Sequence, residues 1–413
     1  MIKKNIVAGL EMSRNKLSMA AAEIKNGNFD LLFTSKVRCQ DGIKNGAIIN
    51  LDSVTEAMLT LLEEARQKGE KGISSVFVNI SGLNIKQELV NSAITLPQRG
   101  CEITQKHIKD LIESCKIVSV PMDKYLLHLF PLEYKIDGQE GVRDPLGLCG
   151  NRLEAEVMIV TAPFNQVQNI IKAVNFCGME AEEVILTAVA NTHSMLTDEE
   201  KKQGVLLIDL KTDSTEISIF KEYSLLFFKA IPKGQANITN KIATRLNVPF
   251  EIAEELKIKY GFLDSAQQDA RNQDVIPVEW LGEKQNITRG EINKIVSEQL
   301  ESIFNMILQE IRNFKAFSNV VKAGAVISGG CTDMEGIMEW VNQNLKFTVK
   351  RGSLKQNLGS LKQDLGSAGH DYTTSLGLLE FGLKKRQKRQ TEGNTKFFKK
   401  VFRKTGELLS DYF

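Results

Sequence analysis

The sequence lacks several patterns that define whole classes of protein. Its six cysteines are scattered and no two have C-x-x-C spacing, which argues against a zinc ribbon or disulfide framework and favours cytosolic free thiols. Its four histidines show no H-E-x-x-H or other ligand spacing. No apolar run approaches the roughly 20 residues of a membrane-spanning helix, and the apolar stretch before Glu11 is too short for a signal peptide.

Composition and charge describe what is present instead. The 413 residues are 42% hydrophobic and 25% charged, as in ordinary globular proteins, and they suffice for two or more domains. The net charge is +2, but residues 384–413 contain ten Lys and Arg against three Asp and Glu. That segment therefore carries +7 and the rest of the chain −5. This distribution predicts that the tail makes the main electrostatic contacts.

Two strand-turn-strand segments, about 200 residues apart, suggest an internal repeat. In "NIVAGLEMSRNKLSMAAAEI" an apolar strand from Ile6 to Leu10 is followed by Glu11 and a polar turn. In "LLIDLKTDSTEISIF" an apolar strand ends at Asp209, and another polar turn follows. Helices alternate with strands in both halves, so we expect two similar α/β lobes facing each other across a cleft.

The remaining patterns predict the elements around these hairpins. Helical spacing favours helices in "SVTEAMLTLLEEARQKG" and in "VQNIIKAVNFCGMEAEEVIL", the latter closed by Gly178. Residues 84–163 are interpreted as a small α+β insert, with strands in "NIKQELVNSAITLP", "YLLHLFPLEYKID" and "LEAEVMIVTA" and a Thr-capped helix in "ITQKHIKDLIESCKIV". Amphipathic helices are expected in "NITNKIATRLNVPFEIAEELKIKYG" and "TRGEINKIVSEQLESIFNMILQEIRNF". A strand, a Gly-Gly turn and a helix start are expected in "KAGAVISGGCTDMEG".

The last 18 residues, 396–413, segregate apolar from charged side chains. At about 100° per residue, the large apolar side chains fall within one arc of about 160°, and every charged side chain lies outside it. Such segregation is typical of an interfacial helix with a basic polar face. A helix docked on the protein's own body and nucleic-acid binding are the alternatives, although aromatics on one stripe suit lipid better than splayed bases. The apolar arc contains Phe397, Phe398, Val401, Phe402, Leu408, Leu409, Tyr412 and Phe413, and the neighbouring basic residues are Lys399, Lys400, Arg403 and Lys404.

Together these segments resemble the FtsA family of actin-like bacterial cell-division proteins over almost the whole chain. The marks are the two hairpins, "GIKNGAIIN", "DPLGLCGNRLE", "AEELKIKYG", "VISGGCTDMEG", "TTSLGLLEFG" and the tail. The resemblance implies an actin-like (RNase H-like) two-lobed α/β fold with a family-specific α+β insert and a C-terminal amphipathic helix. It implies a first-lobe core of 1–83 and 164–203, an insert of 84–163, a second-lobe core of 204–240 and 325–383, a helical subdomain of 241–324, a basic linker of 384–395 and a membrane helix of 396–413.

The resemblance also implies a nucleotide, ATP or ADP with magnesium, between the lobes. The family's second turn reads roughly Asp-Ile-Gly-Gly-Gly-Thr-Thr-Asp, and its first turn has Gly-Thr-Ser-Lys after an Asp. The glycines of both turns are absent here, which narrows the approach of phosphate to the backbone. The implied contacts are Glu11, Ser13, Arg14, Asn15 and Lys16 in the first turn, Asp209, Lys211, Thr212, Asp213, Ser214 and Thr215 in the second, and Gly234, Glu254, Lys257, Gly329 and Gly330 elsewhere.

The lost glycines leave three readings of the cleft open. Side chains could fill an empty cleft, the chain could hold nucleotide without efficient turnover, or it could be a competent ATPase. Lys211 and Arg14 could supply positive charge to phosphate in place of backbone N–H groups. Asp209 is the metal candidate, through a magnesium-bound water. No catalytic residue is predicted, and Cys331 is interpreted as a packing residue.

The function implied by the resemblance is a non-enzymatic scaffold at the cytoplasmic face of the cell membrane at the division site. It would bind the C-terminal tail of FtsZ through the helical subdomain, self-associate through the insert and attach to the anionic inner membrane surface through the tail. Later division proteins are further expected partners, and nucleic acid is not. An ATP-dependent small-molecule kinase of the same fold is one alternative, although it would need a positioned base and no basic tail. A pilus-assembly relative is the other.

Overall fold

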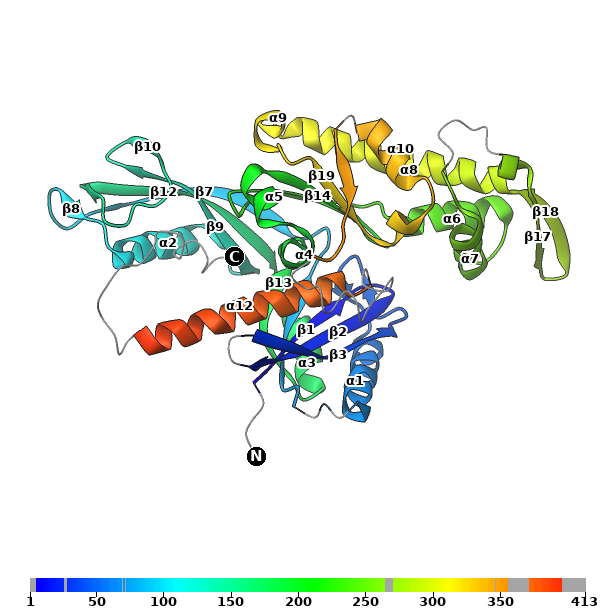
Figure 1. Cartoon of the computed structure of the whole chain (residues 1–413), viewed down its shortest axis with the longest axis horizontal. Helices are drawn as coiled ribbons and strands as arrows, with labels where there is room; N and C mark the ends of the chain where they lie inside the picture. Colours follow the sequence, from blue (N-terminus) through cyan, green and yellow to red (C-terminus); the bar gives the residue numbers. More distant parts are fainter. Residues whose placement is uncertain are drawn as a thin grey trace. The chain divides into compact units, whose positions relative to one another are not determined.

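The computed structural model describes residues 5–25, 28–68, 70, 72–263, 270–345, 347–355 and 371–395, and the chain divides into two compact units (Figure 1). The first unit draws its described residues from Met1–Lys201, Glu222–Phe228 and Ser353–Phe413, and the second from Lys202–Lys221 and Lys229–Gly352. Within the described residues, no helix is long and apolar enough to cross a membrane.

The central sheet of the first unit has the strand order β13-β6-β1-β2-β3. Strand β2 is antiparallel to both of its neighbours, β1 and β3, whereas β6 pairs in parallel with β1 and with β13. The strand bounds are β1 Ile6–Met12, β2 Lys16–Lys25, β3 Asn28–Arg38, β6 Ser75–Ile80 and β13 Glu180–Leu186, and a small hairpin pairs β4 Ile43–Lys44 with β5 Ala47–Ile48. The predicted first hairpin is therefore confirmed as β1 and β2.

Helices of the first unit pack against this sheet through their apolar faces. Helix α1 (Leu51–Gln67) begins at Asn50, whose side chain accepts a hydrogen bond from the Ser53 N–H at 3.1 Å. Helix α3 (Phe164–Phe176) ends just before Gly178, the residue predicted to close it. Gly178 adopts a left-handed φ of 74° that breaks the helix, and the following residues form β13. The predicted end of this helix is therefore confirmed.

Helix α12 (Thr373–Thr395) belongs to the first unit, where it packs against β1 and helix α4 (Thr187–Met195) (Figure 1). Gly9 on β1 permits this contact, because a Cβ there would lie 2.2 Å from the Ser375 carbonyl oxygen. The assignment of 325–383 to the second lobe is therefore wrong for its last part, because the described residues from Ser353 onward belong to the first unit. The physical reason is burial, since the apolar side chains of this helix pack within the first unit.

The segment 384–395 was expected to be a linker, but it continues α12 as a helix. Arg386 donates to Asn5 Oδ1 and to the Ile6 carbonyl oxygen, both at 2.9 Å, and forms an ion pair with Glu182 on β13. Lys385 pairs with the adjacent Glu183. These basic side chains have acidic and carbonyl partners on the folded unit, so the helix does not end where the apolar sequence stops.

Residues 86–163 form the insert, which has its own sheet in the order β10-β9-β12-β7 and one helix, α2 (Figure 1). The predicted Thr cap is confirmed, because Thr104 Oγ1 accepts from the His107 N–H and His107 Nδ1 accepts from the Thr104 N–H. Apolar side chains from α2, β7, β9 and β12 make a separate core. The bounds are β7 Lys86–Thr95, β8 Cys101–Glu102, α2 Gln105–Ser119, β9 Lys124–Ile136, β10 Gln139–Val142, β11 Cys149–Gly150 and β12 Arg152–Pro163.

A buried histidine joins the insert to the first-unit core. His128 lies on β9, and its Nε2 accepts a hydrogen bond from the Leu186 N–H at 2.9 Å, where β13 ends. That nitrogen can accept only while it is unprotonated. Burial, together with the charge of Lys385, lowers the pKa of His128 to about 3. The neutral imidazole is therefore a structural part of the junction.

This junction predicts that acid weakens the first unit. The folded pKa of His128 lies below the ordinary value, so the unfolded chain binds the extra proton, and stability is present above about pH 6.5 and lost as pH falls toward 3. Each pH unit below 6.5 should cost about 1.4 kcal/mol. We expect urea denaturation followed by circular dichroism to show a shallower pH slope for His128→Gln, whose amide oxygen can still accept from Leu186. An unchanged slope would contradict this role of His128. His193 is also buried with a pKa well below the ordinary value, so it adds its own share to the pH dependence of stability.

A second five-stranded sheet repeats the pattern of the first, with the order β16-β15-β14-β19-β20. Strand β14 is antiparallel to β15 and parallel to β19, which is parallel to β20. The predicted repeat is thus confirmed at the level of the sheets. The bounds are β14 Val205–Leu210, β15 Thr215–Lys221, β16 Ser224–Ile231, β19 Ala325–Ser328 and β20 Val349–Arg351.

Helices and one further hairpin complete the second unit. The two helices predicted from residues 237–261 are α6 and α7, and the long helix predicted after them is α8, which begins at a Thr288–Glu291 capping box. The hairpin of β17 and β18 was not predicted. The bounds are α6 Gln235–Leu246, α7 Phe250–Tyr260, η1 Ala270–Gln273, β17 Val275–Trp280, β18 Glu283–Thr288, α8 Arg289–Asn313, α9 Phe317–Val320, η2 Gly330–Asp333 and α10 Ile337–Leu345, and α5, Asp198–Gln203, precedes β14.

Candidate functional site

The first predicted phosphate turn connects β1 to β2 in the first unit. The Ser13 N–H donates to the Lys16 carbonyl oxygen at 3.0 Å and closes a tight turn, and the Ser13 hydroxyl donates to the same oxygen at 2.9 Å. Asn79 on β6 fixes the strand end, because its Oδ1 accepts from the Met12 N–H at 2.6 Å. The turn is therefore held from within and from the neighbouring strand.

Lys16 in this turn already has negatively charged partners. Its Nζ donates to the Asp371 carbonyl oxygen at 2.5 Å and lies 3.3 Å from Asp371 Oδ1 and 3.8 Å from Glu11 Oε2. Burial alone would lower the pKa of Lys16, but Glu11 and Asp371 hold it above the ordinary value. Glu11 also accepts from the Ser18 hydroxyl at 2.8 Å. Sequence reasoning missed Asp371, and no local signal links residues so far apart in the chain.

The second predicted turn connects β14 to β15 in the second unit. The Lys211 N–H donates to the Ser214 carbonyl oxygen at 3.0 Å. The Lys211 ammonium lies 2.6 Å from Glu216 Oε2 and 3.8 Å from Asp209 Oδ2. Asp209 accepts a further hydrogen bond, from the Ser328 hydroxyl on β19, at 2.9 Å. The lysine at a former glycine position is thus engaged with the acids of its own hairpin.

The backbone of both turns explains how they tolerate the loss of glycine. No residue in 12–16 or 210–215 has a positive φ. Ordinary side chains therefore fit these backbones without strain, and a glycine here would serve close approach of a ligand rather than turn geometry.

Gly234 brings the second turn against the start of α6. A Cβ on Gly234 would lie 2.4 Å from the Lys211 carbonyl oxygen and 2.6 Å from that of Thr212. Those two carbonyls accept from the N–H groups of Gln235 and Ala236, at 2.9 and 2.8 Å. These first amides of α6 are consequently occupied by the turn, so charge on a bound phosphate would have to be met by side chains.

The Gly-Gly turn after β19 lies against the same strand end. Gly329 has a φ of 109°, and a Cβ there would lie 2.0 Å from the Leu210 carbonyl oxygen. The Gln235 side-chain amide donates to that oxygen at 2.5 Å. Burial raises the pKa of the neighbouring Cys331 thiol to about 11, which agrees with a packing role.

Glu254 and Lys257 form a linked group between α6 and α7. The Lys257 ammonium lies 2.7 Å from Glu254 Oε2 and 3.0 Å from Thr239 Oγ1, and the Thr239 hydroxyl also bonds Glu254. Only 5% of the Lys257 side chain is exposed, against 34% for Glu254. Glu254 is therefore the more accessible end of this group, and Lys257 holds it in place.

The structure thus gathers the predicted residues into separate groups. Glu11 and residues 13–16 share one turn of the first unit, whereas Asp209, residues 211–215, Gly234, Gly329 and Gly330 gather at the end of β14 in the second. Among the described residues no group of three or more His, Cys, Asp or Glu could hold a metal ion. The predicted membrane residues in 396–413 lie outside the described part of the chain.

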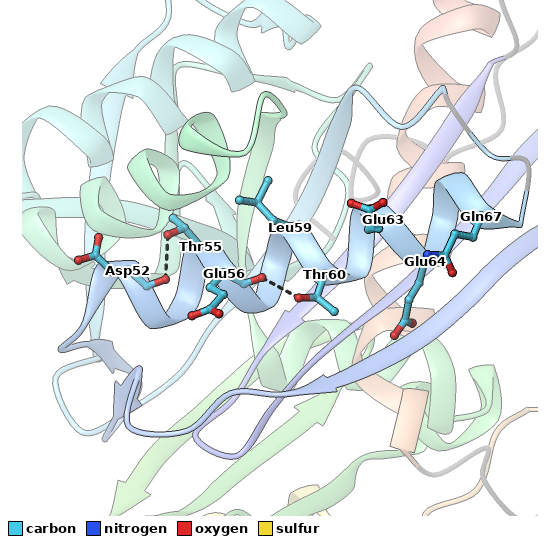
Figure 2. Close-up of a pocket in the computed structure, with 8 residues that line it drawn as sticks. All are labelled: Asp52, Thr55, Glu56, Leu59, Thr60, Glu63, Glu64 and Gln67. Carbon is cyan, nitrogen blue, oxygen red and sulfur yellow. Dashed lines mark hydrogen bonds between the residues drawn. The ribbon is translucent and has the colours of Figure 1, made fainter.

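A pocket of about 660 Å³ lies elsewhere, along the exposed side of α1 (Figure 2). Its residues include four carboxylates, and Figure 2 shows the Thr60 hydroxyl bonded to the Glu56 carbonyl oxygen of the same helix. Such a negative lining disfavours phosphate, so the pocket is not a candidate for the predicted nucleotide. The residues drawn are Asp52, Thr55, Glu56, Leu59, Thr60, Glu63, Glu64 and Gln67.

Known families match two long parts of the chain. Residues 82–161 match the family described as the SHS2 domain inserted in FtsA, and residues 206–377 match the family described as cell division protein FtsA. The cell division protein FtsA of Pseudomonas aeruginosa is 31% identical over 386 residues, which cover 92% of this chain and 90% of that protein. That of Buchnera aphidicola is 27% identical, with 97% and 96% covered.

Solved structures confirm the predicted actin-like fold. A PilM-PilN type IV pilus biogenesis complex matches with a TM-score of 0.63 and 16% identity, covering 91% of this chain and 98% of that one. MreB 5 of Spiroplasma citri bound to AMPPNP matches with a TM-score of 0.54 and 10% identity, covering 95% and 98%. At these identities the likeness shows the fold alone.

Proposed function

The chain belongs to the FtsA family of cell division proteins, and from this premise we propose that it is a membrane-attached scaffold that anchors FtsZ at the division site. The match to the family over nine-tenths of the chain is the observation that carries the proposal. The membrane part is supported by the basic amphipathic pattern of residues 396–413, which would lie on the anionic cytoplasmic face. The scaffold would also help to recruit later division proteins.

The proposal includes binding of ATP or ADP without efficient turnover. A neighbour of the same fold was solved with AMPPNP. In this chain the first amides of α6 are already occupied, so phosphate would depend on the cationic side chains Arg14, Lys16 and Lys211. A magnesium ion on Asp209 fits poorly, because the Lys211 ammonium lies 3.8 Å from that carboxylate. Glu254 and Lys257, joined by Thr239, would serve the base and ribose side.

Exposed apolar residues support FtsZ binding by the helical part of the second unit, 241–324. Ile258 on α7 is 73% exposed, and Leu281, between β17 and β18, is 84% exposed. Large apolar side chains in water are suited to bury against a partner segment. The C-terminal tail of FtsZ is the proposed occupant.

The insert would mediate self-association into oligomers or filaments. It has a core of its own, so its surface can be presented without support from the rest of the unit. Met122 and Leu148 on this surface are exposed apolar residues, at 103% and 46%. A contact between the insert of one subunit and the neighbouring subunit would bury Met122 and Leu148.

Co-sedimentation with anionic vesicles tests the scaffold proposal. We expect FtsZ to pellet with vesicles only when the full-length chain is present, and Ile258→Asp to reduce FtsZ recovery at least about tenfold while the variant itself still pellets. Ile49→Asp is the matched control, because Ile49 is 60% exposed and lies in the first unit. A wild-type chain that pellets without recruiting FtsZ would overturn the anchoring function.

A further inference from the structure

Two carboxylates face each other beside the second turn. Asp209 and Glu216 are direct partners in the antiparallel register of β14 and β15, so their side chains stand on the same face of the sheet. Both are sheltered from water, with 13% of the Asp209 side chain and 2% of the Glu216 side chain exposed. Two negative charges in such surroundings need a positive partner.

The partner in this structure is the Lys211 ammonium. It lies 2.6 Å from Glu216 Oε2 and 3.8 Å from Asp209 Oδ2, and 20% of the lysine side chain is exposed. The backbone of Lys211 is fixed on both sides, because its N–H donates to the Ser214 carbonyl and its carbonyl accepts from the Gln235 N–H. The turn therefore fixes the backbone from which the lysine side chain reaches Glu216 and Asp209.

A divalent cation would compete with this ammonium for the same carboxylates. Magnesium and manganese take oxygen ligands such as carboxylates, and a positive charge next to them opposes their binding. The Ser328 hydroxyl also donates to Asp209 Oδ1 at 2.9 Å and engages that oxygen. The donor set of the hairpin is thus satisfied without a metal.

We propose that Lys211 is a built-in cation that replaces a divalent metal in this hairpin. Asp209 then binds no magnesium, and phosphate held by the second unit is held without a metal at this position. The claim that Asp209 binds no magnesium is independent of the proposed membrane function. The claim that phosphate is held without a metal rests on the proposed nucleotide binding. The hypothesis of a magnesium-bound water on Asp209 is set aside by this proposal.

Manganese alone is the first probe, and electron paramagnetic resonance of free Mn²⁺ measures its binding to the full-length chain. We expect the wild type and Asp209→Asn to bind equally little Mn²⁺. Lys211→Met removes the ammonium and should gain about one Mn²⁺ per chain, with a rise in Tm of about 2 °C or more at saturating metal. Lys211→Arg keeps the positive charge and should show neither the bound Mn²⁺ nor the rise in Tm. The double variant Asp209→Asn with Lys211→Met should lose both effects.

Two results would overturn the built-in cation. One is a bound Mn²⁺ in the wild type that Asp209→Asn removes, a comparison that does not require Lys211→Met to fold. The other is a folded Lys211→Met that takes up no metal.

Calorimetric titration of the wild type with ADP tests whether phosphate is held without a metal. We expect the same Kd in EDTA as in magnesium chloride. A tighter Kd in magnesium that Asp209→Asn abolishes would contradict the claim that phosphate is held without a metal. If ADP binds in neither buffer, the nucleotide proposal fails, and the Mn²⁺ comparison decides the built-in cation by itself.

Discussion

Deletion of residues 396–413 is expected to release the protein from anionic vesicles and to leave the two units folded. The deletion removes the whole apolar arc and five of the ten basic residues of 384–413. Each basic residue near an anionic surface contributes roughly 1 kcal/mol, and burial of the aromatic side chains adds to this. Helix α12 ends at Thr395, before the deleted segment, so no contact described within the units is lost. Vesicle flotation measures the release, and an unchanged Tm serves as the folding control.

A single charge in the apolar arc should act nearly as strongly as the deletion. Phe402→Glu places a carboxylate within the apolar arc that would meet lipid, and its burial is strongly unfavourable. Ser410→Glu adds the same charge at about 220° from Phe397 on the helical wheel, outside the apolar arc, and should reduce flotation only slightly. Raising the salt concentration should weaken binding without abolishing it, because only the electrostatic part is screened. Flotation of the truncated chain would show that the anchor lies elsewhere.

Local pattern predicted the parts of the fold whose causes are local. The two hairpins follow from apolar strands bounded by polar turns, and α2 begins at Thr104, as its cap predicted. Helix α12 shows where this reasoning stops. Lys385 and Arg386 were interpreted as linker residues from their charge, but their partners Glu183 and Glu182 lie about 200 residues earlier on β13. A long-range ion pair leaves no trace in the local composition.

The contacts at the candidate site also divide into those that the sequence could predict and those that it could not. The pair of Lys211 and Glu216 could be found from the sequence, because the hairpin register places Glu216 opposite Asp209 once the turn is located. The contact of Lys16 with Asp371 could not, since nothing in either segment identifies the other. The hydrogen bonds that occupy the first amides of α6 were also out of reach, because they depend on how closely the turn approaches the helix.

Gly234→Ala is expected to destabilise the second unit by about 3–5 kcal/mol. The φ of Gly234 is −147°, which alanine adopts freely, so the backbone conformation is not the obstacle. The obstacle is space, since the new Cβ would lie within 2.6 Å of three backbone atoms of the turn, in Lys211, Thr212 and Ser214. Relief requires the turn to move away from α6, which breaks the bonds from Gln235 and Ala236. Trp280 and Trp340, the two tryptophans of the chain, both lie in this unit, so fluorescence during urea denaturation reports its unfolding.

Gly330→Ala provides the matched control within the same group of residues. The three heavy atoms nearest to its Cβ would all belong to the flexible Gln235 side chain, the closest at 3.1 Å, and we expect a change of about 1 kcal/mol or less. A similarly small effect of Gly234→Ala would mean that the turn and α6 can separate at little cost. The first amides of α6 would then be open to phosphate, and the argument that side chains must meet the phosphate charge would fail. A large effect of Gly234→Ala alone would show that the turn is held against the helix, so that Gly234 serves packing of the protein rather than approach of a ligand.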